Sequence, residues 1–299
     1  MLLIGTQLIN NSLSNINKQK MQSSEQLKSL VQQKYSEIAL QDKEVNQASC
    51  CGAGGCSTEV YNIMSDDYTT LGGYNPDADL GLGCGLPTQF AKIKKGDTVV
   101  DLGSGAGNDC FIARAETGET GRVIGIDFTP AMVDKARANA AKLGFSNVEF
   151  LQGDIENMPL ADNVADVIVS NCVLNLVPNK DGVFQEIFRT LKPGGHFSIS
   201  DIVLVGDLPE ALQKDAEMYA GCVAGAIQKD AYLELIHQNG FNWVTVQKQK
   251  AIVIPDDILK NYLNEAELAK FKSGETGIFS ITVFAKKPES CCAPGSGCC

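Results

Sequence analysis

The stretch Val99-Val-Asp-Leu-Gly-Ser-Gly-Ala-Gly107 decides the fold that we expect for this 299-residue chain. It begins with apolar residues typical of a parallel strand that is buried on both faces. It ends with Gly103, Gly105 and Gly107, and glycines let the backbone turn sharply and approach a ligand closely. Open α/β sheets bind their ligands beyond the carboxyl ends of the strands. We therefore expect a ligand site at this loop.

Strand and helix signals alternate after this loop. Apolar runs predict strands at 98–102, 122–126, 148–151, 165–170, 197–203, 243–254 and 278–286. Helical patterns cover 24–40, the stretch from about 108, 129–144, 180–191, 209–219, 229–239 and the stretch from 256. Thr129 is the expected N-cap and Gly144 the expected end of one helix, and Lys192-Pro-Gly-Gly195 should stop another. This alternation predicts an α/β fold: a doubly wound, mostly parallel, seven-stranded sheet with helices on both faces.

Carboxylates stand at or near the ends of the second and third predicted strands. Asp127 ends the second strand, 26 positions after Asp101, where it could accept hydrogen bonds from both ribose hydroxyls of a nucleoside. Asp154 ends the third strand, where it could accept from an adenine amino group. Either acid could instead be a strand-end cap. The pattern favours a nucleoside ligand.

An adenosine with an aminoacyl end fits these residues better than a dinucleotide does. Phosphate-binding loops more often carry Gly-x-Gly-x-x-Gly or end in Lys-Ser/Thr, and the chain has neither pattern here. Phe128 could pack on the adenine, and Asn171 should lie under the ligand or in a turn. We expect S-adenosyl-L-methionine as the cofactor, bound by Asp101, Gly103, Gly105, Gly107, Asp127, Phe128, Asp154, Ile155 and Asn171.

Eleven cysteines are spread over the chain, and three of them lie in glycine-rich or strand-end motifs. Cys84 lies in Gly81-Leu-Gly-Cys-Gly-Leu-Pro87, Cys172 in Ser170-Asn-Cys-Val-Leu-Asn-Leu-Val-Pro178, and Cys222 in Ala220-Gly-Cys-Val-Ala-Gly225. Thiolates select soft, thiophilic atoms, so these positions indicate a soft substrate. Free cysteine is often simply buried, and this is the reading we expect for Cys110. The remaining cysteines are Cys50, Cys51, Cys56, Cys291, Cys292, Cys298 and Cys299.

Charge and composition narrow the possible partners and compartments. The net charge of −11 argues against nucleic acid and against an anionic membrane as partners, because both need basic patches. No apolar run approaches the roughly 20 residues of a membrane helix, and the first residues do not form a convincing signal peptide. We therefore expect a cytoplasmic protein with reduced thiols. Only two histidines are present, which argues against a histidine-rich zinc site, and no metal cofactor is expected.

Three motifs together resemble the arsenite S-adenosylmethionine methyltransferases. They are Val99-Val-Asp-Leu-Gly-Ser-Gly-Ala-Gly-Asn-Asp109, the motif around Cys172 and Leu82-Gly-Cys-Gly-Leu86, and the resemblance runs from about Tyr35 to Pro288. It implies a class I methyltransferase domain with an insertion for arsenic. It also implies that Cys84, Cys172 and Cys222 are the arsenic-handling cysteines. The fourth family cysteine lies in the N-terminal segment: counting from Tyr35 favours Cys50 or Cys51, and counting back from Cys84 favours Cys56. We place Cys51 in the catalytic set with the other three.

The resemblance implies methyl transfer to thiol-bound trivalent arsenic. Arsenite and then methylarsenite would be the substrates, thioredoxin or glutathione the reductant, and arsenic detoxification the role. A methyltransferase of a quinone- or sterol-like molecule shares the fold and the glycine loop, and a protein that sequesters soft metals would share the cysteines. The three cysteine motifs argue against the first alternative, and the adenosine-site residues argue against the second.

The expected organisation has five parts. They are a disordered extension at 1–22, a helix with cysteine-bearing loops at 23–95, a cofactor-binding core at 96–205, an arsenic-binding insertion with the last strands at 206–288, and a flexible cysteine-rich tail at 289–299. Translation could start at Met1 or at Met21.

Overall fold

The computed structural model describes residues 24–40, 66–207, 225–253, 256–260, 263–273 and 277–289. The predictions for the extension 1–22 and the helical segment 209–219 lie outside the described residues, as does all of the tail after residue 289. Cys51 and Cys222 also lie outside them.

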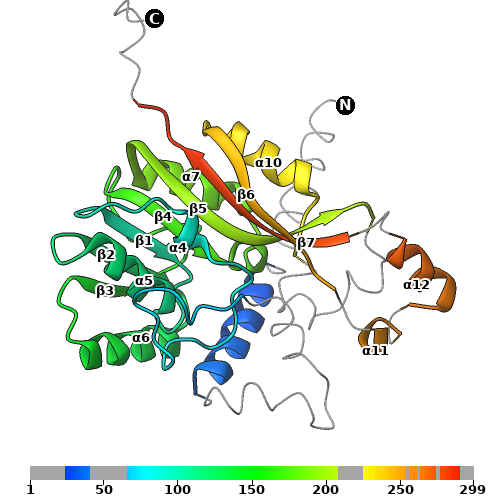
Figure 1. Ribbon diagram of the computed structural model, residues 1–299, viewed down its shortest axis with the longest axis horizontal. Helices are drawn as coiled ribbons and strands as arrows, with labels where there is room; N and C mark the ends of the chain where they lie inside the picture. Colours follow the sequence, from blue (N-terminus) through cyan, green and yellow to red (C-terminus); the bar gives the residue numbers. More distant parts are fainter. Residues whose placement is uncertain are drawn as a thin grey trace, which may run out of the picture.

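A single seven-stranded sheet forms the centre of the molecule, in the order β3-β2-β1-β4-β5-β7-β6 (Figure 1). The first five strands pair in parallel, and β7 is antiparallel to both of its neighbours. The predicted mostly parallel sheet is therefore confirmed. The strands are β1 (Thr98–Leu102), β2 (Arg122–Asp127), β3 (Val148–Gln152), β4 (Ala165–Asn171), β5 (Leu191–Val205), β6 (Asn242–Ala251) and β7 (Gly277–Lys286).

Helices cover both faces of the sheet, as predicted (Figure 1). Val99 and Val100 are both fully buried but belong to different apolar clusters, because neighbouring strand residues point to opposite faces. Val99 packs with residues of α5 (Asn108–Thr117) and α6 (Pro130–Leu143), and Val100 with residues of α7 (Lys180–Thr190) and α10 (Lys229–Gln238). The helices are α4 (Pro87–Phe90), α5 (Asn108–Thr117), α6 (Pro130–Leu143), the 3-10 turn η2 (Leu174–Leu176), α7 (Lys180–Thr190), α10 (Lys229–Gln238), α11 (Asp256–Leu259), α12 (Glu265–Lys272) and an unlabelled helix over 24–40.

Two local details differ from the sequence prediction. Strand β5 begins at Leu191, ahead of the Lys192-Pro-Gly-Gly195 run that we expected to separate helix from strand. The register between β4 and β5 shifts at this run, and the Gly194 N–H donates to Lys287 O at 3.1 Å. Thr129 does occupy the N-cap of α6, but its hydroxyl makes no capping hydrogen bond.

The chain order of the strands reverses beside β1, which lies between β2 and β4. Such a switch point leaves a crevice beyond the carboxyl ends of the strands, where open α/β sheets bind ligands. The 24–40 helix lies at this end of the sheet, and Lys135 Nζ of α6 donates to its Ala39 O at 3.0 Å. None of the described helices is long and apolar enough to cross a membrane.

Candidate functional site

The glycine loop between β1 and α5 forms the floor of the site. Gly103, Gly105 and Gly107 all have positive φ values, +68°, +52° and +100°, which side-chain-bearing residues rarely adopt. A methyl group on Gly103 would lie 2.4 Å from Val173 Cγ2. One on Gly105 would meet no protein atom within 4 Å, so within the protein it is the positive φ that favours glycine here. The expected tight loop is present.

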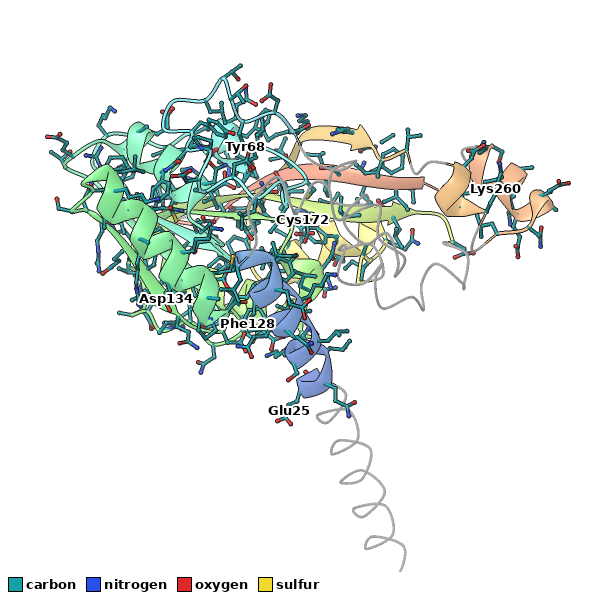
Figure 2. All side chains as sticks on the ribbon, turned by 90° about the horizontal axis from the view of Figure 1, so that it is seen from below. Glu25, Tyr68, Phe128, Asp134, Cys172 and Lys260 are labelled. Atoms are coloured by element: carbon teal, nitrogen blue, oxygen red, sulfur yellow. The ribbon has the colours of Figure 1, made fainter. Side chains whose placement is uncertain are left out.

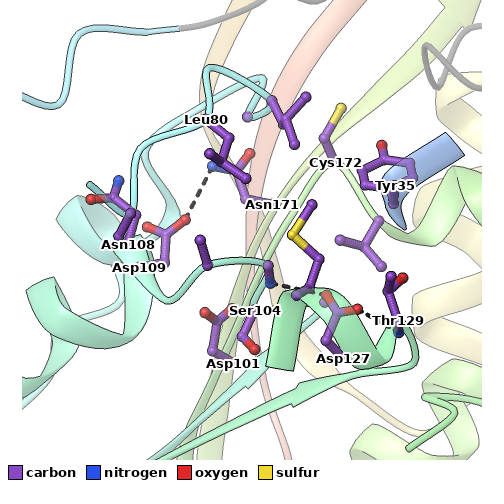
Figure 3. Close-up of a pocket in the computed structure, with 18 of the residues that line it drawn as sticks. Tyr35, Leu80, Asp101, Ser104, Asn108, Asp109, Asp127, Thr129, Asn171 and Cys172 are labelled. Atoms are coloured by element: carbon purple, nitrogen blue, oxygen red, sulfur yellow. Dashed lines mark hydrogen bonds between the residues drawn. The ribbon is translucent and has the colours of Figure 1, made fainter. Parts of the chain in front are cut away.

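A cavity opens above this loop, at the carboxyl ends of β1, β2 and β4 (Figure 3). It holds about 800 Å³ of space, part of it open to solvent. Its lining comes from the loop, from the 66–86 segment and from the 24–40 helix. Most of the predicted cofactor residues border it: Asp101, Gly103, Gly105, Asp127, Phe128 and Asn171.

Asp127 lies at the end of β2 with its carboxylate fixed by the backbone (Figure 3). Oδ2 accepts from Gly105 N at 2.9 Å, and Oδ1 accepts from Thr129 N at 2.8 Å. Burial raises the pKa of this carboxyl above its ordinary value, and the two backbone hydrogen bonds oppose the shift. A carboxylate has about four acceptor positions, so two remain for the hydroxyls of a ribose.

Two further acids, Asp101 and Asp109, line the same cavity. Asp101 accepts from the Cys110 thiol at 3.3 Å, and its pKa is well above the ordinary range because it is buried and near Asp109. Burial also raises the pKa of Asp109 to about 6, against the hydrogen bonds from Tyr68 and Asn171. A positively charged ligand group in the cavity would favour the ionised form of both acids.

Three buried polar atoms in the cavity wall lack a hydrogen-bond partner within the described structure. They are Ser104 Oγ, Asn108 Oδ1 and Thr129 Oγ1. Buried polar groups are normally paired, so each of these positions suits a polar ligand group. Together with the acids, they fit a ligand that carries hydroxyl and ammonium groups, as S-adenosylmethionine does.

A second cavity of about 410 Å³ borders the end of β3. Asp127 and Phe128 line this cavity together with Asp154 and Ile155. The structure therefore brings Asp154 and Ile155 beside the other predicted cofactor residues. The Asp154 side chain is 41% exposed and forms an ion pair with Lys28.

Cys84 and Cys172 belong to one buried cluster, although they are far apart in sequence. Cys172 follows β4 with a φ of +62°, lines the first cavity and donates its N–H to Ser200 O at 2.8 Å. Cys84 is fully buried. Cys110 is a core residue as expected, packed in a different cluster.

Asn171 connects the cavity with the loop of Cys84. Its Oδ1 accepts from Cys84 N at 3.0 Å, and its Nδ2 donates to Gly85 O at 2.8 Å and to Asp109 at 3.3 Å. A methyl group on Gly83 would lie 2.6 Å from Asn171 Nδ2, which explains a glycine next to Cys84. Asn171 is thus more than the turn residue or cofactor support that the sequence suggested.

Tyr68 is the site residue that the sequence analysis missed most completely. Its hydroxyl oxygen lies 3.0 Å from both Asp109 Oδ2 and Gly85 O, and its single hydrogen can be donated to either. It lies in an irregular segment with no local pattern to single it out. Asp109, in the first turn of the helix after the glycine loop, could have been found from its position.

The fold and the site define a class I S-adenosylmethionine-dependent methyltransferase. A family model described as a methyltransferase domain matches residues 93–240. Among solved structures, the arsenic (III) S-adenosylmethionine methyltransferase CrArsM from Chlamydomonas reinhardtii is 34% identical. Its TM-score is 0.59, with 69% of this chain and 68% of that chain covered.

Curated relatives narrow the class to a family. The arsenite methyltransferase of Halobacterium salinarum is 38% identical over 280 residues, which cover 88% of this chain and 67% of the relative. That of Aquipseudomonas alcaligenes is 32% identical over 258 residues, covering 84% and 71%. The chain belongs to the arsenite methyltransferase family.

Proposed function

We propose that this methyltransferase transfers the methyl group of S-adenosylmethionine to thiol-bound trivalent arsenic, first arsenite and then methylarsenite. The proposed role is arsenic detoxification in the cytoplasm. The observation that carries this proposal is the position of two cysteines. Cys172 borders the cofactor cavity, and Cys84 lies in the same buried cluster. Soft ligands next to a methyl-donor site suit a soft, thiophilic acceptor.

The cofactor would lie across both cavities. Asp127 would accept from the ribose hydroxyls, while Phe128, Ile155 and Asp154 would surround the adenine. The acidic pair Asp101 and Asp109 would face the positively charged aminoacyl end. When bound, S-adenosylmethionine supplies an electrophilic methyl group on a sulfonium.

Arsenic held by Cys84, Cys172 and Cys222 would keep its lone pair, and that pair would attack the methyl carbon. The carbon–sulfur bond breaks, and its electrons stay on the departing sulfur. No proton has to be removed, so this step needs no general base. The protein contributes the orientation of two bound reactants.

Methylation raises arsenic formally to the pentavalent state, so two electrons must return. Two thiolates can supply them by forming a disulfide, and we propose Cys84 and Cys51 as this pair. Thioredoxin or glutathione would then reduce the disulfide by thiol exchange. The N-terminal cysteine segment would thus act in the redox step.

Labelled S-adenosylmethionine tests this function directly. With arsenite and a thiol reductant, we expect labelled methylarsenicals, and Cys172→Ser should abolish them while cofactor affinity is retained. Serine keeps the shape but offers a hard oxygen ligand. Cys291→Ser, in the tail, is the matched control and should keep full turnover. Full turnover by Cys172→Ser would contradict the proposal, and label transfer to a quinone-like acceptor without arsenite would support the organic-substrate alternative.

Cys84 allows a finer test. Inorganic arsenite can bind three thiolates, whereas methylarsenite has one position taken by carbon and needs two. In a single turnover, before the redox step, Cys84→Ser should therefore reduce methyl transfer to arsenite more than methyl transfer to methylarsenite. Equal losses on the two substrates would remove Cys84 from this role.

A further inference from the structure

The 24–40 helix is held against the ends of β2 and β3 by two polar side chains one turn apart. Lys28 Nζ lies 2.6 Å from Asp154 Oδ2 and also contacts Glu156 Oε2. Gln32 Nε2 donates to Phe128 O at 3.0 Å. Residues four apart lie on the same face of a helix, so one face makes both contacts. Figure 2 shows this helix running from Glu25 past Phe128.

The apolar side of the same helix closes the wall of the first cavity. Val31, only 1% exposed, and Tyr35 both line this cavity. Val31 packs in the cluster that contains Cys172. The helix is therefore part of the cavity wall, and its polar contacts determine where that wall lies.

Lys28 also borders the second cavity, beside Asp154 and Ile155. The turn 154–156 is also held by hydrogen bonds that do not involve the 24–40 helix. Asp154 Oδ1 accepts from Glu156 N at 2.9 Å, and Glu156 Oε1 accepts from Asn179 N at 2.8 Å. Lys28 thus adds a cation to a turn whose two carboxylates would otherwise repel each other.

The Lys28 ammonium keeps its charge in this position. Burial alone would lower its pKa, but the hydrogen bonds to Asp154 and Glu156 outweigh burial and raise the pKa above its ordinary value. The Lys28 side chain is 29% exposed, so salt can screen the two ion pairs. Ionic strength, more than pH, is therefore the variable that should weaken this contact.

We propose that Lys28 is a positioning residue for the cofactor. It fixes the Asp154–Glu156 turn at the adenosine end of the site, and with Gln32 it holds the 24–40 helix closed over the bound cofactor. Cofactor affinity then depends on a side chain outside the glycine loop and outside the strand ends. This inference concerns cofactor binding alone, so it can fail while the proposed arsenic chemistry stands.

The test compares Lys28→Met and Lys28→Arg with Lys192→Met in the full-length protein, without arsenic. Lys192 forms a similar ion pair with Asp166 at 2.7 Å, but at the opposite ends of the strands. Calorimetry gives the Kd of S-adenosylmethionine and S-adenosylhomocysteine at low and high NaCl, and a chase with unlabelled ligand gives the dissociation rate.

We expect Lys28→Met to raise both Kd values about three- to tenfold at low salt, the size expected for two partly exposed ion pairs. Dissociation of the cofactor should be faster from Lys28→Met, and its Kd should depend less on salt than the Kd of the wild type does. In a separate turnover assay with arsenite, the KM for the cofactor should rise at unchanged kcat. Lys28→Arg should restore most of the affinity, and Lys192→Met should match the wild type.

Unchanged Kd values and salt dependence in folded Lys28→Met would overturn the proposal, as would equal losses in Lys192→Met. Glu156→Gln provides a second route if Lys28→Met does not fold. It removes one ion pair, while Oε1 can still accept from Asn179 N. A smaller loss of affinity in the same direction supports the proposal, and wild-type affinity with wild-type salt dependence contradicts it.

Discussion

Replacing Asp127 with alanine should separate the contribution of this carboxylate to cofactor binding from its contribution to the loop. Asp127 is 8% exposed, and its carboxylate already accepts two backbone N–H groups. A hydrogen bond to a charged group is worth about 1.5–3 kcal/mol. Loss of the ribose contact should therefore weaken S-adenosylmethionine binding roughly 10- to 150-fold. The N–H groups of Gly105 and Thr129 lose their acceptor at the same time, so unfolding should become easier by about 1–3 kcal/mol for each donor left unpaired.

Asp127→Asn should give intermediate values for both quantities. Its amide oxygen can accept one of the two N–H groups, but its amide nitrogen would face the other donor. Calorimetric titration measures the affinity, and urea unfolding measures the stability. Asp97→Ala is the control, because Asp97 also accepts a backbone N–H, from Lys94 at 2.8 Å, at the amino end of β1. Unchanged cofactor affinity in folded Asp127→Ala would refute the reasoning.

Three further changes test other parts of the site. Gly103→Ala combines a φ of +68° with a methyl group 2.4 Å from Val173, so urea unfolding should show a loss of roughly 2–4 kcal/mol, and a wild-type value would contradict the strained loop. Burial raises the pKa of Asp109 to about 6 in the folded protein, so its stabilising contribution is complete below about pH 4 and is lost as pH rises through 6. The free energy of unfolding, measured from pH 4 to 7, should therefore decline less in Asp109→Asn than in the wild type. Parallel pH profiles of the two proteins would refute the raised pKa of Asp109. Gly83→Ala should displace Asn171 from Cys84 N, so arsenite turnover should fall more than cofactor affinity, and equal losses would argue against this coupling.

The sheet could be predicted from the sequence because its central strands are buried on both faces. Val99 and Val100 belong to a short apolar run that ends in glycines, and this local pattern is sufficient to place β1. The start of β5 could not be placed in the same way. Lys192-Pro-Gly-Gly195 has the composition of a loop, but Leu191 and His196 on either side of it pair with β4, and Gly194 and Gly195 exchange backbone hydrogen bonds with the distant Lys287.

The predicted acids that line the cavities could be placed because each stands at or near a strand end, and parallel strands end at one edge of the sheet. Contacts between segments that are distant in the sequence could not be predicted in this way. Tyr68 meets Asp109 across 41 positions, and Lys28 meets Asp154 across 126. Neither contact has a local pattern, because each depends on how an irregular segment or an added helix packs on the finished sheet. The strand-end residues and the motif of Cys84 could thus be found from the sequence, whereas the roles of Tyr68 and Lys28 could not.

The end of β4 shows why cofactor binding and thiol geometry should depend on each other. The Asn171 amide oxygen accepts from Cys84 N, and its amide nitrogen donates to Asp109. The next residue, Cys172, has a left-handed backbone that costs a non-glycine residue about 1–2 kcal/mol. The hydrogen bond from its N–H to Ser200 O holds this conformation. Strain of this kind persists where the surrounding structure over-determines it, often at functional sites. We infer that a ligand that moves Asp109 also changes, through Asn171, the position of Cys84 relative to Cys172.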